Sequence, residues 1–303
     1  MTAPTPLVEV GATAATRVED AAPLFLKCEH LQPSGAFKIR GAYTAIRRLP
    51  TAQRRRGVVT SSSGNHGQAV AWVGRHFGIA SVVVMPESAP EVKVEGVRRY
   101  GGEVVFAGAV RSPEQQVCAE ALSRERGLVF IPPFDHPDVI AGQGTVGLEI
   151  LEQLPAVRTV LVPVGGGGLL SGITAALADH PEIEIVGVEP VRAAKLSRAL
   201  AAGRPETLLE TGGIADGLLT RAIGNLPWAL ISGRVRRALC VSDEEIGRAV
   251  QWLFRRQGLR VEPSGAVTVA AWLGGAVRAA GTTVAVLSGG NVDPGLFERL
   301  VTA

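Results

Sequence analysis

Apolar runs typical of β-strands alternate with segments of helical period from about residue 20 to the end of the chain. This alternation is typical of βαβ units, and it predicts mainly parallel sheets covered by helices on both faces. We expect strands at residues 23–27, 58–61, 81–85, 103–107, 128–131, 159–164, 183–188, 235–241 and 283–287. We expect helices at residues 42–49, 67–77, 90–100, 112–126, 169–178 and 243–257.

The number of predicted strands indicates more than one domain. Eight or nine strands are many for one sheet, so we expect an α/β protein of two βαβ domains, with the site in the crevice between them. A chain of 303 residues with 46% hydrophobic content is long enough to build two cores of ordinary size.

Charge and apolar patterning exclude several classes of partner. The formal net charge is only +3, the arginine pairs are scattered, and 5% of the residues are aromatic, so we expect no nucleic-acid partner. No apolar run reaches membrane-spanning length, and no charged segment followed by an apolar one stands at the N-terminus. We therefore expect a cytoplasmic protein without a membrane partner.

The three cysteines, Cys28, Cys118 and Cys240, are far apart, and no two of them have CxxC spacing. This pattern indicates neither a disulfide framework nor a zinc site. Cys118 and Cys240 lie in apolar surroundings, so we expect both in the core.

Lys38 is a candidate reactive amine. It lies in the segment PSGAFK (33–38), between the first predicted strand and the first predicted helix. Pro33 and Gly35 interrupt the chain there, and Ser34 is a candidate helix N-cap. Lys38 then falls in the first turns of the helix, where the helix dipole disfavours a further positive charge. A lowered pKa would leave the amine lone pair free to attack a carbonyl. The alternative is a solvated surface lysine.

Three loops follow the carboxyl ends of predicted strands, where ligands bind in open α/β sheets. They are residues 61–67 (SSSGNHG), 165–169 (GGGGL) and 288–291 (SGGN). Glycine lets backbone amides approach an anion closely, and the helix after the second loop adds a partial positive charge at its N-terminus. The four glycines therefore predict a phosphate-binding cup.

The residues around the glycine loop indicate which phosphate-containing ligands it could bind. Gly166, Gly168 and Ser171, with Glu189 about twenty residues further on, imitate a dinucleotide fingerprint whose third glycine is missing. No Walker lysine follows the glycines, so a nucleoside triphosphate is not expected.

A reactive lysine and a phosphate cup between two α/β domains point instead to pyridoxal phosphate (PLP). Lys38 would hold the aldehyde of this cofactor. Asn65 could hydrogen-bond its ring hydroxyl, and Ser288 could reach its ring nitrogen.

The sequence resembles the fold-type II PLP enzymes, specifically the threonine/serine dehydratase and serine racemase family. The motifs that carry the resemblance occur in the family's order and span nearly the whole chain. They are LKCEHLQPSGAFKIRGA (26–42), SSGNHGQA (62–69), IAGQGT (140–145), PVGGGGLLSG (163–172), GVEP (187–190), IADGL (214–218), VEPSGA (261–266) and LSGGNVD (287–293). The resemblance implies a tryptophan synthase β-like fold. Residues 1–56 and 135–303 would form the large PLP-binding domain, and residues 57–134 a small mobile domain that closes the site.

The resemblance also implies residue roles. Lys38 would form the Schiff base and remove the α-proton of the substrate, Phe37 and Asn65 would contact the cofactor ring, and Ser288 would hydrogen-bond the pyridine nitrogen. The cofactor phosphate would be bound by Gly165, Gly166, Gly167, Gly168 and Leu169. The substrate carboxylate would be bound by Ser62, Ser63, Gly64, Asn65 and His66. The implied reaction is β-elimination, which converts a small 3-hydroxy amino acid such as L-threonine or L-serine to a 2-oxo acid and ammonia.

Three alternatives remain open from the sequence. The nearest is an amino-acid (serine) racemase with the same cofactor, in which Ser63 would be the acid–base group on the face opposite Lys38. More distant alternatives are an NAD-dependent oxidoreductase that uses the glycine loop and Glu189, and a catalytically silent binding protein. In metal-stimulated serine racemases, a glutamate in GVEP and an aspartate six residues later help to hold a cation. Lys195 replaces that aspartate here, so we expect no metal.

The chain departs from the family pattern at three places. Ala36 stands where the family usually has serine or threonine, which removes one polar contact near the phosphate. The helix that usually precedes the TPL segment (5–7) is absent, which bears on the dimer contacts, although we expect a homodimer. No regulatory domain follows residue 293, so we expect a catabolic or specialised role.

Overall fold

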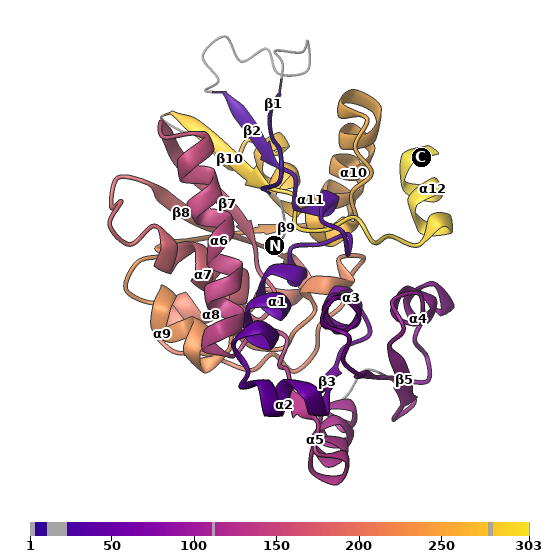
Figure 1. Ribbon diagram of the computed structural model, residues 1–303. Coiled ribbons are helices and arrows are strands. Elements are labelled where there is room, and N and C mark those ends of the chain that lie inside the picture. Colours follow the sequence, from indigo (N-terminus) through magenta and orange to yellow (C-terminus); the bar gives the residue numbers. More distant parts are fainter. Residues whose placement is uncertain (1–3, 11–22, 111–112, 278–280, 303) are drawn as a thin grey trace.

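Two β-sheets with helices packed around them make up the computed structural model, which describes residues 4–10, 23–110, 113–277 and 281–302 (Figure 1). The larger sheet has the strand order β1-β2-β10-β7-β8-β9, and the smaller has the order β5-β4-β3-β6. In the larger sheet the strands are β1 (Leu7–Glu9), β2 (Leu24–Lys27), β7 (Val157–Pro163), β8 (Glu184–Pro190), β9 (Arg237–Val241) and β10 (Thr282–Val286). In the smaller sheet they are β3 (Val58–Ser61), β4 (Ser81–Met85), β5 (Glu103–Phe106) and β6 (Val129–Phe130).

Both sheets are mainly parallel, which confirms the predicted α/β class. Every pairing between these strands is parallel except that of β1 with β2. The strand β1 was not predicted, because only three residues carry it. Each predicted strand lies within two residues of its observed bounds.

The helices cover both faces of each sheet. They are α1 (Lys38–Arg48), α2 (Thr51–Arg56), α3 (Asn65–Phe77), α4 (Glu91–Arg98), α5 (Glu114–Arg126), α6 (Pro137–Gln153), α7 (Gly168–Ala176), α8 (Lys195–Ala202), α9 (Asn225–Ile231), α10 (Asp243–Gln257), α11 (Pro263–Leu273) and α12 (Pro294–Thr302). Short 3₁₀ turns are η2 (Glu29–Leu31), η3 (Val191–Ala193) and η4 (Asp216–Leu218).

Alternating side chains of the strands belong to different cores. In β7, Leu161 packs in a cluster with α10 and α11, whereas Val160 and Val162 pack in a cluster with α6 and α7. In the smaller sheet, Val59 faces α5, and Val58 contributes to a cluster with α1 and α3. The strands are therefore buried on both sides, which explains their continuous apolar runs.

Helix α6 was not predicted, and its glycines explain why. Gly142 and Gly144 weaken the helical signal in the sequence. In the structure, a Cβ at Gly142 would lie 2.4 Å from the Arg40 carbonyl oxygen of α1, and one at Gly144 would lie 2.8 Å from the Gly172 carbonyl oxygen of α7. These glycines let α1 and α7 each approach α6 closely, so α6 fixes the positions of both helices.

Two local predictions were wrong. The N-cap of α1 is Phe37, without a side-chain capping bond, so Ser34 does not cap the helix, which begins at Lys38 rather than at residue 42. Cys240 is exposed on β9 instead of lying in the core, because β9 is the edge strand of the larger sheet.

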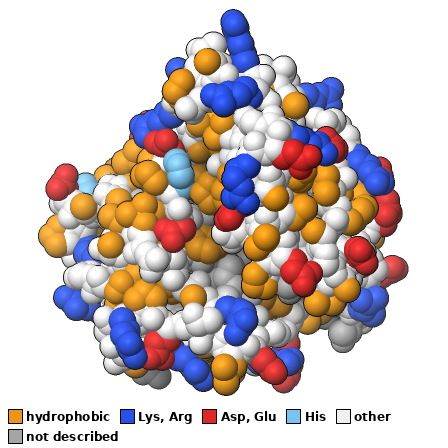
Figure 2. Space-filling model, turned by 90° about the horizontal axis from the view of Figure 1, so that it is seen from below, with side chains coloured by type: hydrophobic (Ala, Val, Ile, Leu, Met, Phe, Trp, Pro, Cys, Tyr) orange, Lys and Arg blue, Asp and Glu red, His pale blue; other side chains and the backbone are white. Residues whose placement is uncertain are grey.

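Surface charge is mixed on the face seen in Figure 2, where Lys and Arg side chains are interspersed with Asp and Glu side chains. None of the helices in the described ranges combines the length and apolar character that a bilayer span needs.

Candidate active site

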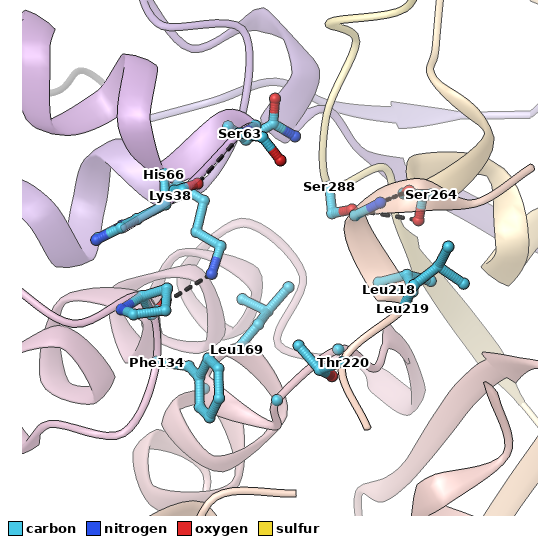
Figure 3. A pocket seen from close by; sticks show the side chains of 18 of the residues that line it. Lys38, Ser63, His66, Phe134, Leu169, Leu218, Leu219, Thr220, Ser264 and Ser288 are labelled. Carbon is cyan, nitrogen blue, oxygen red and sulfur yellow. Dashed lines mark hydrogen bonds between the residues drawn. The ribbon is translucent and has the colours of Figure 1, made fainter. Parts of the chain in front are cut away.

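A cavity of about 220 Å³ lies between the two sheets, at the carboxyl ends of strands from both. Its walls come from the Lys38 segment, the loops after β3, β6 and β7, and the residues around η4 (Figure 3). Three predicted loops meet there, as expected for the crevice of α/β domains. The lining includes Phe37, Lys38, Ser61, Ser62, Ser63, Gly64, Asn65, His66, Gly165, Gly166, Gly167, Gly168, Leu169 and Ser288.

Lys38 is the first residue of α1, and its side chain points into this cavity (Figure 3). Its Nζ donates a hydrogen bond to the Pro133 carbonyl oxygen at 2.6 Å and lies 5.2 Å from the centre of the Phe37 ring. Burial lowers the pKa of the Lys38 amine to about 8, because the surrounding protein disfavours the charged form. About one-tenth of the amine is therefore unprotonated at pH 7, far more than for a lysine with the ordinary pKa of 10.5.

The four glycines between β7 and α7 form the floor of the cavity. Gly167 has a φ of +91°, which favours glycine, and a Cβ there would lie 2.9 Å from the Cβ of Pro227. A Cβ at Gly166 would lie 2.5 Å from the ring of Phe134. The loop is thus shaped by close neighbours, with the N-terminus of the nine-residue helix α7 behind it. This arrangement suits an anion.

Ser62, Ser63 and Gly64 lead into α3, which begins at Asn65. The first-turn N–H groups of a helix lack partners within the helix, and those of α3 lie at the cavity. His66 lines the cavity, but its Nε2 lies 3.1 Å from the Ile131 carbonyl oxygen, so Nε2 carries the hydrogen. Burial and the nearby Lys38 charge lower the pKa of His66 to about 3, so its imidazole is neutral.

Ser288 lies across the cavity from Lys38 (Figure 3). Its Oγ is 3.5 Å from the Ser264 carbonyl oxygen, a long contact that leaves the hydroxyl available for a ligand. The backbone of this loop is tied to the Lys38 segment, because the Phe37 N–H donates to the Ser288 carbonyl oxygen at 3.0 Å and Ala36 pairs with Gly289.

Several lining residues were missed from the sequence. Phe134 packs on the glycine floor, and Leu218, Leu219 and Thr220 form a wall beside Ser264 and Ser288 (Figure 3). Phe134 follows the carboxyl end of β6, so the rule that singled out the three loops would have found it as well.

Glu189 and Lys195 meet in the interior, away from the cavity lining. Both side chains are fully buried, with Nζ 3.7 Å from Oε2. The Lys195 Nζ donates to the carbonyl oxygens of Ala193 at 2.9 Å and Leu218 at 3.0 Å. Burial lowers the pKa of Lys195 to about 8. The Glu189 carboxylate accepts the backbone N–H groups of Leu196 and Ser197, both at 2.8 Å.

The fold and the site together define a class of protein. A lysine amine of lowered pKa, a glycine cup at a helix N-terminus and two mainly parallel sheets around one cavity are the parts of a fold-type II PLP enzyme. The family model for pyridoxal-phosphate dependent enzymes matches residues 1–289 of the chain. The chain belongs to this family, and its cofactor is PLP.

Similar proteins include both lyases and racemases. An L-threonine ammonia-lyase from Geobacter sulfurreducens is 44% identical over 273 residues, which cover 89% of this chain and 68% of that protein. A serine racemase from Oryza sativa subsp. indica is 41% identical over 286 residues, covering 91% of this chain and 84% of that protein. The structure of maize serine racemase is similar with a TM-score of 0.92 at 38% identity, covering 98% of this chain and 91% of that one.

The residues at the cavity fit PLP. The Thr220 hydroxyl and the His66 Nδ1 are buried at the cavity wall without a hydrogen-bond partner within the described ranges, which indicates a missing ligand. The glycine cup and the Lys38 amine match a phosphate and an aldehyde. An NAD-dependent oxidoreductase is excluded by the family, and Glu189 is occupied by backbone N–H groups rather than open to a ribose.

Proposed function

We propose that this protein is a PLP-dependent lyase that dehydrates and deaminates a small 3-hydroxy amino acid, such as L-threonine or L-serine, to a 2-oxo acid and ammonia. The observation that carries the proposal is the Lys38 amine, whose pKa burial lowers to about 8, in a cavity between a glycine cup and a serine-rich loop. Similarity to L-threonine ammonia-lyases supports the lyase class.

The chemistry divides between the cofactor and the chain. PLP supplies the electron-withdrawing group that makes the α-proton of a bound amino acid acidic. Lys38 holds the cofactor and then acts as the base for that proton, which its lowered pKa permits near neutral pH. Ser288 would offer a neutral hydroxyl to the pyridine nitrogen, and Phe37 and Asn65, which line the same cavity, would contact the ring.

Phosphate and carboxylate are bound by different helix N-termini. Residues 165–169 at the start of α7 bind the cofactor phosphate. Ser62, Ser63 and Gly64, with Asn65 and His66 in the first turn of α3, would bind the substrate carboxylate through backbone N–H groups and side chains. Residues 57–134 form the small domain, which closes over the cavity and excludes water from the reacting groups.

The cavity suits a small, neutral side chain. Its lining has Lys38 and Glu262 as charged residue types, and apolar side chains at Val84, Leu218 and Leu219. Among the described residues that line the cavity, a substrate with a second carboxylate, such as 3-hydroxyaspartate, would meet no arginine. A substrate whose hydroxyl-bearing β-carbon carries only hydrogens, as in serine, or a methyl group, as in threonine, would fit the cavity.

A racemase is the second candidate, favoured by Ser63 and by the similarity to serine racemases. Ser63 lines the same cavity as Lys38 (Figure 3), and a racemase would use its hydroxyl as the second proton-transfer group. Elimination needs only the Lys38 face, so the two activities are separable by assay.

We also propose that catalysis needs no divalent cation, because the Lys195 ammonium lies among the Ala193 and Leu218 carbonyls and Glu189. We propose a homodimer from the family resemblance, and a cytoplasmic location from the sequence patterns alone. Analytical ultracentrifugation tests the dimer.

One experiment separates the two activities. The purified protein is given L-serine, L-threonine and L-3-hydroxyaspartate, and 2-oxo acids and D-amino acids are quantified together by chiral chromatography. We expect 2-oxo acid to form far faster than D-amino acid, and Lys38→Ala to abolish both turnover and the visible absorption of lysine-bound PLP. Ser63→Ala should leave elimination measurable. Faster accumulation of D-amino acid would favour the racemase.

A further inference from the structure

A line of side-chain hydrogen bonds runs along the cavity wall and includes two motif residues that the proposed mechanism does not use. Asn291 belongs to the SGGN loop, and Glu262 precedes α11 in the VEPSGA motif. The Asn291 Nδ2 donates to the Ser34 carbonyl oxygen and to the Asn65 Oδ1, both at 2.8 Å. The Asn65 Nδ2 donates to the Glu262 Oε1 at 2.5 Å.

The direction of this line is fixed at one end. A backbone carbonyl can only accept, so the amide nitrogen of Asn291 must face Ser34. The same nitrogen faces Asn65, which must therefore present its oxygen there. The Asn65 nitrogen is then directed at Glu262. It has two hydrogens, of which Glu262 accepts one. The line thus decides which end of the Asn65 amide is the donor.

The backbone leaves room for this line at two glycines. Gly35 has a φ of +75°, and a Cβ there would lie 2.2 Å from the Asn291 Oδ1. A Cβ at Gly289 would lie 2.2 Å from the Glu262 Oε1. Glycine at position 35, near Lys38, therefore leaves space for the Asn291 side chain. Glycine at position 289, next to Ser288, leaves space for the Glu262 side chain.

Glu262 is only 5% exposed. Burial, and next the charge of Asp216 on η4, raise the pKa of Glu262 to about 8, while the Asn65 hydrogen bond and Lys93 on α4 oppose the rise. Lys93 itself forms an ion pair with Asp216. Lys38 and His66 line the same cavity from α1 and α3. Burial and the Asp216 charge therefore favour the neutral acid form of Glu262 near neutral pH.

We propose that Glu262 and Asn291 are positioning residues that hold the Asn65 amide with an N–H, rather than its carbonyl, directed at the ring oxygen of PLP, and that Glu262 does this as a neutral carboxylic acid. A carboxylate at this place would put a negative charge beside the electron-rich ring oxygen. The inference rests on the proposed use of PLP at this site.

Two isosteric variants test the two halves of this inference. In Asn291→Asp the new carboxylate cannot donate to Ser34 or Asn65, so the amide of Asn65 loses its fixed direction. In Glu262→Gln the acceptor for the Asn65 N–H is kept, but the group cannot ionise. Glu244→Gln on α10 is the control, because that side chain is 80% exposed and lies in an ion pair with Arg248.

The readouts are the dissociation constant of PLP for the cofactor-free protein and the absorption maximum of the PLP-bound protein between pH 6.5 and 9.5. We expect Asn291→Asp to weaken PLP binding about tenfold, as the loss of one or two hydrogen bonds predicts. Glu262→Gln should bind PLP within about threefold of the wild type at pH 7 and lose the shift of the absorption maximum near pH 8 that the wild type and Glu244→Gln show.

Each unexpected result would contradict a different part of the proposal. If Asn291→Asp binds PLP within about twofold of the wild type, the positioning role is wrong. If Glu262→Gln weakens binding as much as Asn291→Asp, or keeps the shift near pH 8, the neutral acid is wrong, and this result stands even if Asn291→Asp fails to fold. If the wild-type protein itself binds no PLP, the proposed function fails instead.

Discussion

The Lys38 amine should lower the stability of the cofactor-free protein, and Lys38→Met should remove this cost. A lysine pKa that falls from 10.5 to about 8 corresponds to about 3 kcal/mol against the charged form in the folded state. Below pH 8 this cost is present in full. It disappears as the pH rises from 8 through 10.5, because the unfolded chain then also loses its proton.

The net effect must include the Pro133 carbonyl, which loses the hydrogen bond from Nζ in this variant. An acceptor left without its donor costs about 1–2 kcal/mol. We therefore expect Lys38→Met to be about 1–2 kcal/mol more stable than the wild type at pH 7. At pH 10 the ionisation cost has fallen by about 2.5 kcal/mol, so the order should reverse and the variant should be roughly 1 kcal/mol less stable.

Urea-induced unfolding of the PLP-free proteins at pH 7 and pH 10 measures both differences. Lys93→Met is the control, because Lys93 is paired with Asp216 and its loss should bring no gain at pH 7. The reasoning is refuted if Lys38→Met is less stable than the wild type at pH 7, or if the difference between the two proteins is the same at both pH values.

Two further predictions concern the cofactor cup and the buried lysine. Gly167→Val should sharply reduce the affinity for PLP and the PLP content of the purified protein, because Gly167 has a φ of +91° and a Cβ there would lie 2.9 Å from Pro227; unchanged PLP binding would contradict the cup. Treatment with EDTA should leave turnover unchanged, because the Lys195 ammonium already lies among the Ala193 and Leu218 carbonyls; activity lost with EDTA and restored by Mg²⁺ would contradict this.

The strands and the ligand-binding loops could be predicted because each depends on local chemistry. Strands buried on both faces need continuous apolar runs, and β3 and β4 have the predicted bounds. The four glycines after β7 indicate a tight turn whose backbone carries no side chains. This inference uses only neighbouring residues in the sequence. Lys38 could be placed near a helix start for the same reason, although burial, rather than the helix dipole, is the main cause of its lowered pKa.

What escaped prediction depends on contacts between distant segments. The glycines of α6 weaken its helical pattern, yet they are needed where α6 touches Arg40 of α1 and Gly172 of α7. The position of Phe134 after β6 indicates a ligand-binding loop, but only its contact with Gly166 in the folded chain shows that its ring belongs to the phosphate cup. The pairing of Glu262 with Asn65 joins residues 197 positions apart. The motifs can be recognised in the sequence, but the distances between them in the folded chain cannot be deduced from it.

The strand order of the larger sheet has a consequence for the way the chain folds as it is synthesised. β10, at residues 282–286, pairs with β2 on one side and β7 on the other, so no hydrogen-bonded ladder joins β2 to β7 before β10 is made. The four strands of the smaller sheet all lie between residues 58 and 130 and can pair much earlier. Until β10 has been synthesised, the nascent chain can therefore form the small sheet while β2 and β7 each keep an open edge, and these edges are exposed to pairing with other chains during that interval.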